Sequence, residues 1–426
     1  MLNDREKKLI RQVDASRDEL VELIRDLIKI KSVTRSEIVD GVYTSLSDYR
    51  DITDFATKKL REYGLDVQVI DGGPWKFPVG RLKGSVGKPV FLFVGHLDTV
   101  PSGPRELWHF DPFGAEIRNG KIYGRGAADD KGQFACAMIL PKILRDAEIK
   151  LKGDVIVLTI LDEETAFTNY TTGVAYAVKR GLIGGPGYAD MGIQTEGGDP
   201  LGVSIANTGV LQMRITTHAK HSANVATYLL PNAIEKMMKI VEVFTKELPW
   251  TIQKKKSAVP VDESKLPSHG FVRCTMIDGG FKENVVPTQC SLTIDRRLIP
   301  EEALNEAEGQ ITGVVKRLQS EDPDLEVSIQ NLLELRPFVT PDWENQRITK
   351  VLSAAIQEIH GKAPRCTRSM GGKPHSEIFE RFGTPMIGYG GGSPTGGSHL
   401  PDENIIIENV INATKVYALT VLNALS

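Results

Sequence analysis

Apolar residues recur every three or four positions between Glu6 and Ile30, which is the spacing of a helix that buries one face. A second helix is predicted from about Ser47 to Tyr63, where Gly64 stops it. The segment LDVQVI that follows is typical of a strand, and DGGP after it is typical of a turn. The first part of the chain therefore alternates helices with strands.

Two continuous apolar runs of strand length follow, PVFLFVG at 89–95 and DVIVLTIL at 154–161. Runs of this kind are typical of strands that are buried on both faces, as in a sheet covered by helices. Helices are predicted between them, at about 132–146, and after them, at about 173–180. This alternation predicts an α/β fold with a parallel or mixed sheet.

The middle of the chain has a different order of elements. Strands are predicted at 209–219, 271–279, 289–299 and 325–335, and helices at 232–248 and 301–319. The order β-α-β-β-α-β is that of a ferredoxin-like unit. Two further helices, at about 343–360 and 409–425, return to the first pattern. We therefore predict a discontinuous α/β domain of residues 1–207 and 335–426, with residues 208–334 inserted as a ferredoxin-like domain.

Charge and composition narrow the class of protein. Lys and Arg number 52 against 55 Asp and Glu, a formal net charge of −3, which gives no support for a nucleic-acid partner. The longest apolar runs are strand-sized and shorter than the roughly 20 residues that span a bilayer, and the charged N-terminal segment has no apolar signal region. The four cysteines form no C-x-x-C pair and are expected to be free thiols in a reducing compartment. We expect a cytoplasmic protein.

The first apolar run leads into His96-Leu97-Asp98. Residues two apart at the end of a strand point to the same side of the sheet. Asp98 could therefore orient a metal-bound His96, or both could bind a metal. A hydrogen-bonded structural histidine is the alternative.

A glycine-rich segment, GRGAADDKG at 124–132, contains Asp129. It is not a phosphate loop, because Asp129 stands where G-x-G-x-x-G needs a glycine and no G-K-[ST] follows. A carboxylate at a glycine-rich turn before a helix suits a divalent cation. A helix cap formed by Asp129 or Asp130 is an equally good interpretation at this point.

Glu163 and Glu164 follow the second apolar run, at the edge of the sheet where α/β folds bind ligands. Adjacent carboxylates can divide the work, one binding metal and the other moving a proton. Glu196 and His399 lie in glycine-containing loops and, taken singly, are an ordinary surface glutamate and loop histidine. Together with His96 and Asp129 these residues supply the ligands for two metals that share one carboxylate, with one glutamate left as a base.

Five segments resemble the M20 metallopeptidase family, the group of carboxypeptidase G2, acetylornithine deacetylase, succinyl-diaminopimelate desuccinylase and the carnosinase-type dipeptidases. They are HLDTVP at 96–101, WHFDPF at 108–113, YGRGAADDKG at 123–132, DEE at 162–164 and SHLPDE at 398–403. They occur in the family's order over nearly the whole chain. The resemblance implies a metal-dependent hydrolase of a C–N bond, in an amide or peptide, in a small carboxylate-bearing substrate.

The resemblance also assigns roles. His96 and Glu196 would bind one metal and Glu164 and His399 the other, with Asp129 as the bridge. Asp98 would orient His96. Glu163 would be the general base that takes a proton from water activated by the metal pair and passes it to the leaving amine. Because the ligands are nitrogen and oxygen only, one or two zinc, manganese or cobalt ions per subunit are expected.

The inserted domain corresponds to the family's lid and dimerisation domain, which implies a homodimer, with higher oligomers left open. His221 matches a lid histidine that reaches the partner's active site and stabilises the oxyanion. Asn284 and Arg297 match positions that hold a substrate carboxylate, for which the planar guanidinium is suited. A turn asparagine and a surface arginine are the alternatives.

The loops at 165–172 and 368–376 depart from the family pattern and leave the substrate open. A second hypothesis is therefore an aminohydrolase that removes an amine from a non-peptide substrate, aromatic amines included. A third, a non-catalytic binding protein on the same fold, is disfavoured because no expected metal ligand is missing and Glu163 is present.

Overall fold

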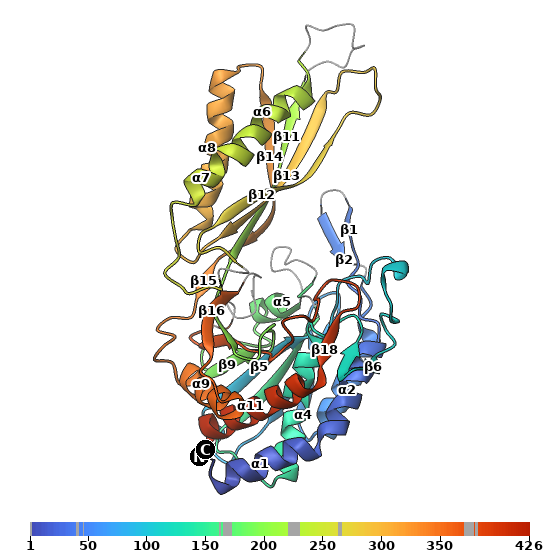
Figure 1. Cartoon of the computed structure of the whole chain (residues 1–426), viewed down its shortest axis with the longest axis vertical. Coiled ribbons are helices and arrows are strands. Elements are labelled where there is room, and N and C mark those ends of the chain that lie inside the picture. The colour runs from blue at the N-terminus through green and yellow to red at the C-terminus, as the bar shows by residue number, and fades with distance from the viewer. Residues whose placement is uncertain are drawn as a thin grey trace. The chain divides into compact units, whose positions relative to one another are not determined.

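The computed structural model describes residues 2–39, 42–45, 47–161, 163–164, 173–219, 231–262, 266–369, 379 and 382–426. The chain forms two compact units (Figure 1). Unit 1 consists of Met1–Ile205, Thr340–Cys366 and Pro374–Ser426. Unit 2 consists of Ala206–Val339 and Thr367–Lys373.

The helices outside the middle of the chain are α1 Asp4–Ala15, α2 Arg17–Lys29, α3 Arg50–Glu62, the short 3-10 helix η1 Arg105–Leu107, α4 Lys131–Asp146, α5 Gly173–Lys179, α9 Arg347–His360 and α11 Ile407–Leu425. The strands are β1 Ser36–Val39, β2 Val42–Ser45, β3 Asp66–Asp71, β4 Lys76–Leu82, β5 Val90–His96, β6 Glu116–Arg118, β7 Lys121–Tyr123, β8 Asp154–Ile160, β9 Met191–Gln194, β10 Gly202–Asn207, β15 Phe338–Val339, β16 Arg365–Ser369, β17 Met386–Gly388 and β18 Asn404–Ile406.

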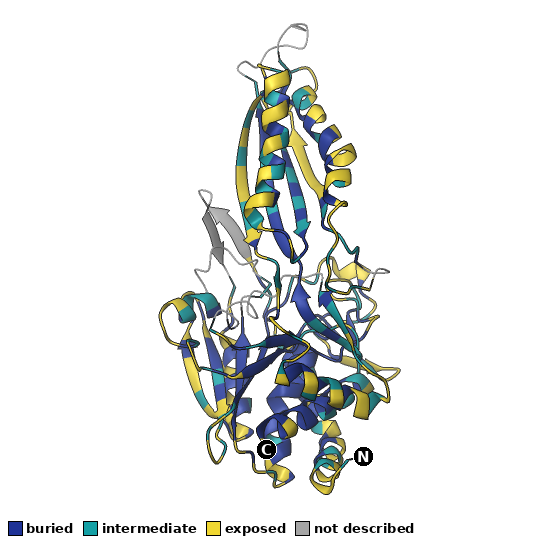
Figure 2. Cartoon of the chain, turned by 90° about the vertical axis from the view of Figure 1, so that its left-hand side faces the viewer, coloured by how far each residue is buried: buried dark blue, intermediate teal, exposed yellow. Residues whose placement is uncertain are grey.

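A nine-stranded mixed sheet has the order β15-β10-β17-β9-β5-β8-β4-β3, with β16 paired to β10. At its centre β5 runs parallel to both β8 and β9, and β17 runs parallel to β9. Every residue of β5 and β8 is buried, and Figure 2 shows in dark blue how buried residues fill the middle of unit 1. The prediction of a mixed sheet with fully buried central strands is therefore confirmed.

Helices α4 and α11 pack against β5 and against each other, and both are buried over most of their length. A helix that is apolar on all sides belongs in the interior of a protein, which explains why neither has a strongly polar face. Helices α1 and α2 pack against α4 in turn. The core of unit 1 therefore lies between the sheet and this outer layer of helices.

The predicted single helix from Glu6 to Ile30 is in fact two helices, α1 and α2, separated at Ser16. The Ser16 hydroxyl donates to the carbonyl oxygen of Gln12 at 2.9 Å. A serine that bonds to a preceding carbonyl competes with the regular helix and often bends it. Apolar periodicity did not reveal the break, because both helices turn their apolar faces toward the same core.

Unit 2 consists mainly of β11 Gly209–His218, α6 Ala233–Lys246, α7 Leu248–Ile252, β12 Phe271–Gly279, β13 Gln289–Leu298, α8 Leu304–Glu321 and β14 Glu326–Leu335. Its antiparallel sheet has the order β12-β13-β11-β14. Alternate residues of β13, such as Leu292 and Ile294, are buried with residues of α6 and α8 in one core. The predicted ferredoxin-like insertion is confirmed.

Candidate metal centre

The parallel strands at the centre of the sheet bring several candidate residues to one edge. His96 is the last residue of β5, and it is in register with Ile160 at the end of β8. Glu164 follows β8 by four residues, and Glu196 follows β9 by two. Because β8 and β9 lie on either side of β5, the side chains after their carboxyl ends converge on His96.

Two loops complete the cluster. Asp129 lies directly before α4, whose N-cap is Asp130, and the Asp130 side chain makes no capping hydrogen bond. Asp130 is therefore the N-cap residue of α4 by position, as the alternative interpretation has it, but its side chain does not cap the helix. The peptide bond between Asp129 and Asp130 is cis. His399 precedes β18 and has φ 65°, a left-handed conformation that few residues other than glycine adopt.

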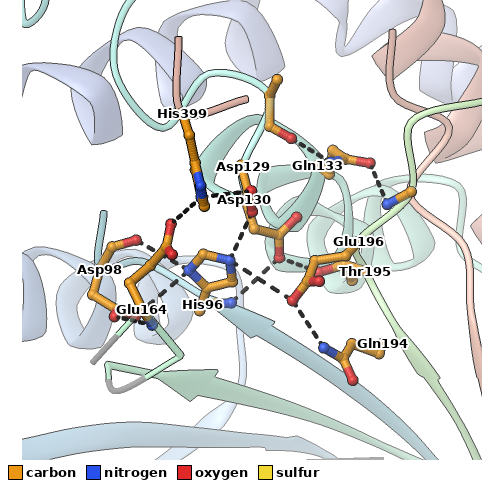
Figure 3. Close-up of polar contacts among 12 residues, drawn as sticks. His96, Asp98, Asp129, Asp130, Gln133, Glu164, Gln194, Thr195, Glu196 and His399 are labelled. Atoms are coloured by element: carbon orange, nitrogen blue, oxygen red, sulfur yellow. Dashed lines mark hydrogen bonds and ion pairs between the residues drawn. The ribbon is translucent and has the colours of Figure 1, made fainter. Parts of the chain in front are cut away.

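The carboxylate of Asp129 faces an imidazole on each side (Figure 3). Its Oδ1 is 3.0 Å from His96 Nε2, and its Oδ2 is 3.4 Å from His399 Nε2. On the first side Glu196 Oε1 is 3.7 Å from His96 Nε2, and on the second Glu164 Oε1 is 3.1 Å from His399 Nε2. The five residues expected as metal ligands therefore form one connected cluster.

Asp98 lies on the far side of His96. Its backbone carbonyl oxygen is 3.0 Å and its Oδ1 is 3.5 Å from His96 Nδ1. Because both atoms can only accept, Nδ1 carries a hydrogen and Nε2 is turned toward Asp129 and Glu196. Asp98 Oδ2 also accepts the backbone N–H of Glu164 at 2.9 Å, so one carboxylate positions parts of both sides of the cluster.

The electrostatics of the cluster are those of a site with excess negative charge. Burial raises the pKa of Glu163 and Glu164, and neighbouring carboxylates raise both further. Hydrogen bonds to Asp129 and Glu164 raise the pKa of His399 to about 10. Burial opposes a charge on His96, yet hydrogen bonds to Asp129 and Asp98 outweigh it, so its pKa also rises well above the ordinary value.

The donor set fits a divalent cation. Ligand atoms of Asp129, Glu164 and His399 all lie within 4.8 Å of one another. All donors in the cluster are imidazole nitrogens or carboxylate oxygens, which zinc, manganese and cobalt accept. A cation would also neutralise carboxylates that burial otherwise disfavours as charged groups.

Residues 92–423 match the sequence model of peptidase family M20/M25/M40. The chain belongs to this family. It is 25% identical to N-formyl-4-amino-5-aminomethyl-2-methylpyrimidine deformylase of Bacillus subtilis, over 96% of this chain and 95% of the relative. It is 26% identical to succinyl-diaminopimelate desuccinylase of Hydrogenovibrio crunogenus, over 96% and 99% of the two chains.

An M20 family metallo-carboxypeptidase from Sulfolobus solfataricus has the same fold, with a TM-score of 0.74, 19% identity and coverage of 95% of this chain and 99% of that one. As a member of family M20, the chain is a metal-dependent hydrolase that acts on amide or peptide C–N bonds of small molecules. In the part of the chain that the structure describes, no helix is long and apolar enough to cross a membrane.

Two of the three residues predicted to contact the substrate lie in the described part of unit 2. Asn284 is exposed between β12 and β13. Arg297 on β13 is half-buried and pairs with Asp295 through two contacts, Nε to Oδ1 at 2.6 Å and Nη2 to Oδ2 at 3.1 Å. His221 lies outside the described residues.

Sequence reasoning did not assign a role to the buried pair of Glu403 and Arg125. Glu403 Oε1 accepts the backbone N–H groups of Ala128 at 2.9 Å and Asp129 at 3.1 Å, and its Oε2 pairs with Arg125 Nη1 at 2.5 Å. The guanidinium lies over the ring of Trp108, 5.3 Å from its centroid. Trp108, Arg125 and Glu403 each belong to one of the segments that resemble the family, and these three segments meet here. That each residue stands in such a segment is the signal by which the sequence could have indicated a role.

We predict that uptake of a divalent cation by the metal-free protein releases protons near pH 7. The raised pKa of His399 means that its imidazole is protonated there, whereas a metal ligand must be neutral. The apparent affinity for the cation should therefore rise between about pH 6 and pH 9. Calorimetric titration in buffers of different ionisation enthalpy counts the protons.

The matched variants are His399→Ala and His269→Gln, the latter in unit 2. His399→Ala should lower the number of protons released, and His269→Gln should leave it unchanged. A proton count of zero for the wild-type protein at pH 7 would contradict a charged His399 in the metal-free state.

Proposed function

We propose that His96 and Glu196 hold one divalent cation, Glu164 and His399 hold a second, and Asp129 bridges them. The observation that carries this proposal is the position of the Asp129 carboxylate, whose two oxygens face two different imidazoles. A carboxylate that binds a single metal ion would need an imidazole ligand on one side only, whereas Asp129 has one on each side. Zinc, manganese and cobalt are the candidate ions, because the donors are nitrogen and oxygen.

When bound, such a cation pair supplies Lewis acidity, which lowers the pKa of water and polarises a carbonyl group. Glu163 then acts as the general base that accepts a proton from water and returns it to the leaving amine. Its raised pKa in the cation-free site reflects burial and nearby carboxylates, and cations would oppose that shift. Asp98 keeps the Nε2 atom of His96 turned toward Asp129 and Glu196, the residues that would hold the cation with it.

We further propose that the substrate is a small N-acyl amine from which an acyl group is hydrolysed. The two relatives support this class, since one is a deformylase and the other a desuccinylase. Arg297 would pair with a carboxylate of the substrate, Asn284 would donate to it, and His221 would stabilise the oxyanion. The pairing of Arg297 with Asp295 supports the first of these roles, because it orients the guanidinium.

Glu163→Gln should lower kcat by about 10²- to 10⁴-fold with KM nearly unchanged, because it removes the proton acceptor and little else. The substrate is first found by screening N-acyl amino acids, N-formyl amines, dipeptides and aromatic amines against the metal-loaded enzyme. Acyl-group release and ammonia release are measured separately, since ammonia without a free acyl group would identify an aminohydrolase instead.

The control for Glu163→Gln is Glu148→Gln, which changes an exposed glutamate that pairs with Lys8. Its turnover should match that of the wild-type enzyme. Metal analysis of both variants checks that the cations remain bound. Full activity in Glu163→Gln would show that another group is the base.

Arg297→Ala should raise KM for a carboxylate-bearing substrate by roughly 10-fold or more, while kcat changes less, because an ion pair made equally in the ground and transition states affects binding. Arg214→Ala is the control, since Arg214 is a half-buried arginine of the neighbouring strand β11. The role assigned to Arg297 is rejected if KM stays the same.

We propose that the enzyme is a homodimer joined through unit 2 and that it works in the cytoplasm. Strand β12 is at the edge of the unit 2 sheet, and Met276, Ile277 and Phe281 on or after it are 66%, 61% and 79% exposed. An unpaired edge beside exposed apolar side chains suits pairing with a second copy. The four cysteines are free thiols, in keeping with a reducing compartment.

The double variant Ile277→Lys, Phe281→Lys should sediment as a monomer, because two added charges cannot be buried in an interface without partners. Analytical ultracentrifugation measures the mass. Val86→Lys, at a 70% exposed position in unit 1, is the control and should stay dimeric. A monomeric wild-type enzyme, or a dimeric double variant, would rule out this interface.

A further inference from the structure

Gln133 lies in the first turn of α4 and is 3% exposed. Its Nε2 donates to the carbonyl oxygen of Ala128 at 2.5 Å, and its Oε1 accepts the N–H of Gly197 at 3.0 Å (Figure 3). Ala128 directly precedes Asp129, and Gly197 directly follows Glu196. One side chain therefore connects the two loops that carry the bridging carboxylate and a terminal ligand.

A second contact joins the same loops on their other flanks. Thr195 Oγ1 donates to Asp130 Oδ2 at 2.6 Å. Thr195 precedes Glu196, and Asp130 follows Asp129. Hydrogen bonds on both flanks of Asp129 and Glu196 therefore join their two loops. Gln133 makes those on one flank with an uncharged amide, and Thr195 and Asp130 make the other.

The loop after β17 is shaped around the Gln133 amide. A Cβ atom at Gly390 would lie 1.7 Å from Gln133 Oε1, and one at Gly392 would lie 2.9 Å from it. The N–H of Gly392 also donates to the carbonyl oxygen of Gly197 at 2.9 Å. Only glycines leave room for the amide to reach both loops.

The chemistry of the contact calls for an amide. The Ala128 carbonyl needs a donor and the Gly197 N–H needs an acceptor, and an uncharged glutamine supplies both from one planar group. A carboxylate would place an oxygen against the carbonyl, and an aliphatic side chain would satisfy neither group. Outer contacts of this kind set how accurately metal ligands are placed.

We propose that Gln133 is a positioning residue that sets the separation of Asp129 and Glu196 and so the affinity for the cation held by His96, Glu196 and Asp129. The inference rests on the ligand assignment proposed above. It concerns mainly the cation that Glu196 would hold, because Gln133 supports the loops of both Asp129 and Glu196, whereas the second cation would share only Asp129 with it.

The test is a titration of metal-free protein with Co²⁺, followed by calorimetry and visible absorption. In Gln133→Met, which keeps the length of the side chain but makes neither hydrogen bond, affinity for one ion should fall by about 10- to 100-fold. That ion should be the one that Glu196→Ala loses. The ion that His399→Ala loses should be weakened much less, because Glu164 and His399 keep their own contact, and the absorption bands of that site should change less.

Gln212→Met is the matched control. It removes a glutamine hydrogen bond to Asp295 Oδ2, 2.8 Å long, in unit 2. Both ions should bind to it as to the wild-type protein. Equal weakening of both ions in Gln133→Met, or no weakening, would overturn the positioning role.

If Gln133→Met does not fold, Gln133→Glu replaces it, because the oxygen that faces Gly197 is retained, and the same selective loss is expected. An unselective loss or none in that variant would overturn the inference equally. A wild-type protein that binds fewer than two Co²⁺ ions would instead contradict the proposed function, which keeps the two failures distinct.

Discussion

The contact of the Asp129 carboxylate with His96 on one side and His399 on the other is the interaction around which unit 1 is organised. Burial alone would make a cluster of carboxylates costly, because each loses the solvation that water gives to a charge. Two imidazoles and divalent cations are the groups that can offset this cost. The excess of carboxylates has two effects. It raises the pKa of His399, because the carboxylates stabilise a charged imidazole, and together with burial it raises the pKa of Glu163, because a further negative charge is disfavoured.

The order and direction of the sheet's central strands bring these charged side chains together. Strands β5, β8 and β9 are parallel, so their carboxyl ends deliver His96, Glu164 and Glu196 to one edge. The two other proposed ligands, Asp129 and His399, come from loops, which need separate support. Glu403, itself paired with the buried Arg125, accepts the backbone N–H groups of Ala128 and Asp129, and Gln133 joins the same loop to Gly197. The proposed ligands are therefore positioned by contacts to their backbone as much as by contacts of their own side chains.

Unit 2 is built on a separate principle. One face of its sheet is covered by α6 and α8, while residues such as Asp295 and Arg297 lie on the other face of the same strand. Strict alternation along β13 produces this division. A polar face that carries an oriented guanidinium suits recognition of a small anionic group, whereas the exposed edge at β12 suits association. In the proposed function, substrate recognition and dimerisation would therefore use different parts of one small sheet.

Some of this was determined by the sequence alone. Apolar runs located β5 and β8, helical periodicity located α6, and the motifs around His96, Asp129 and His399 identified the family before any fold was known. These signals are local, since each depends on neighbouring residues along the chain. The break at Ser16 escaped them, because a helix bend leaves the apolar pattern intact.

Only the tertiary structure decided which atoms meet. It turned the two oxygens of Asp129 toward different imidazoles, paired Arg297 with Asp295, and placed the amide of Gln133 between loops that are more than 60 residues apart in the chain. Such contacts are set by strand register and by the space that glycines leave, and neither has a local pattern in the sequence. The kinds of residues needed for the chemistry can therefore be identified from the chain, but their geometry depends on how distant segments pack.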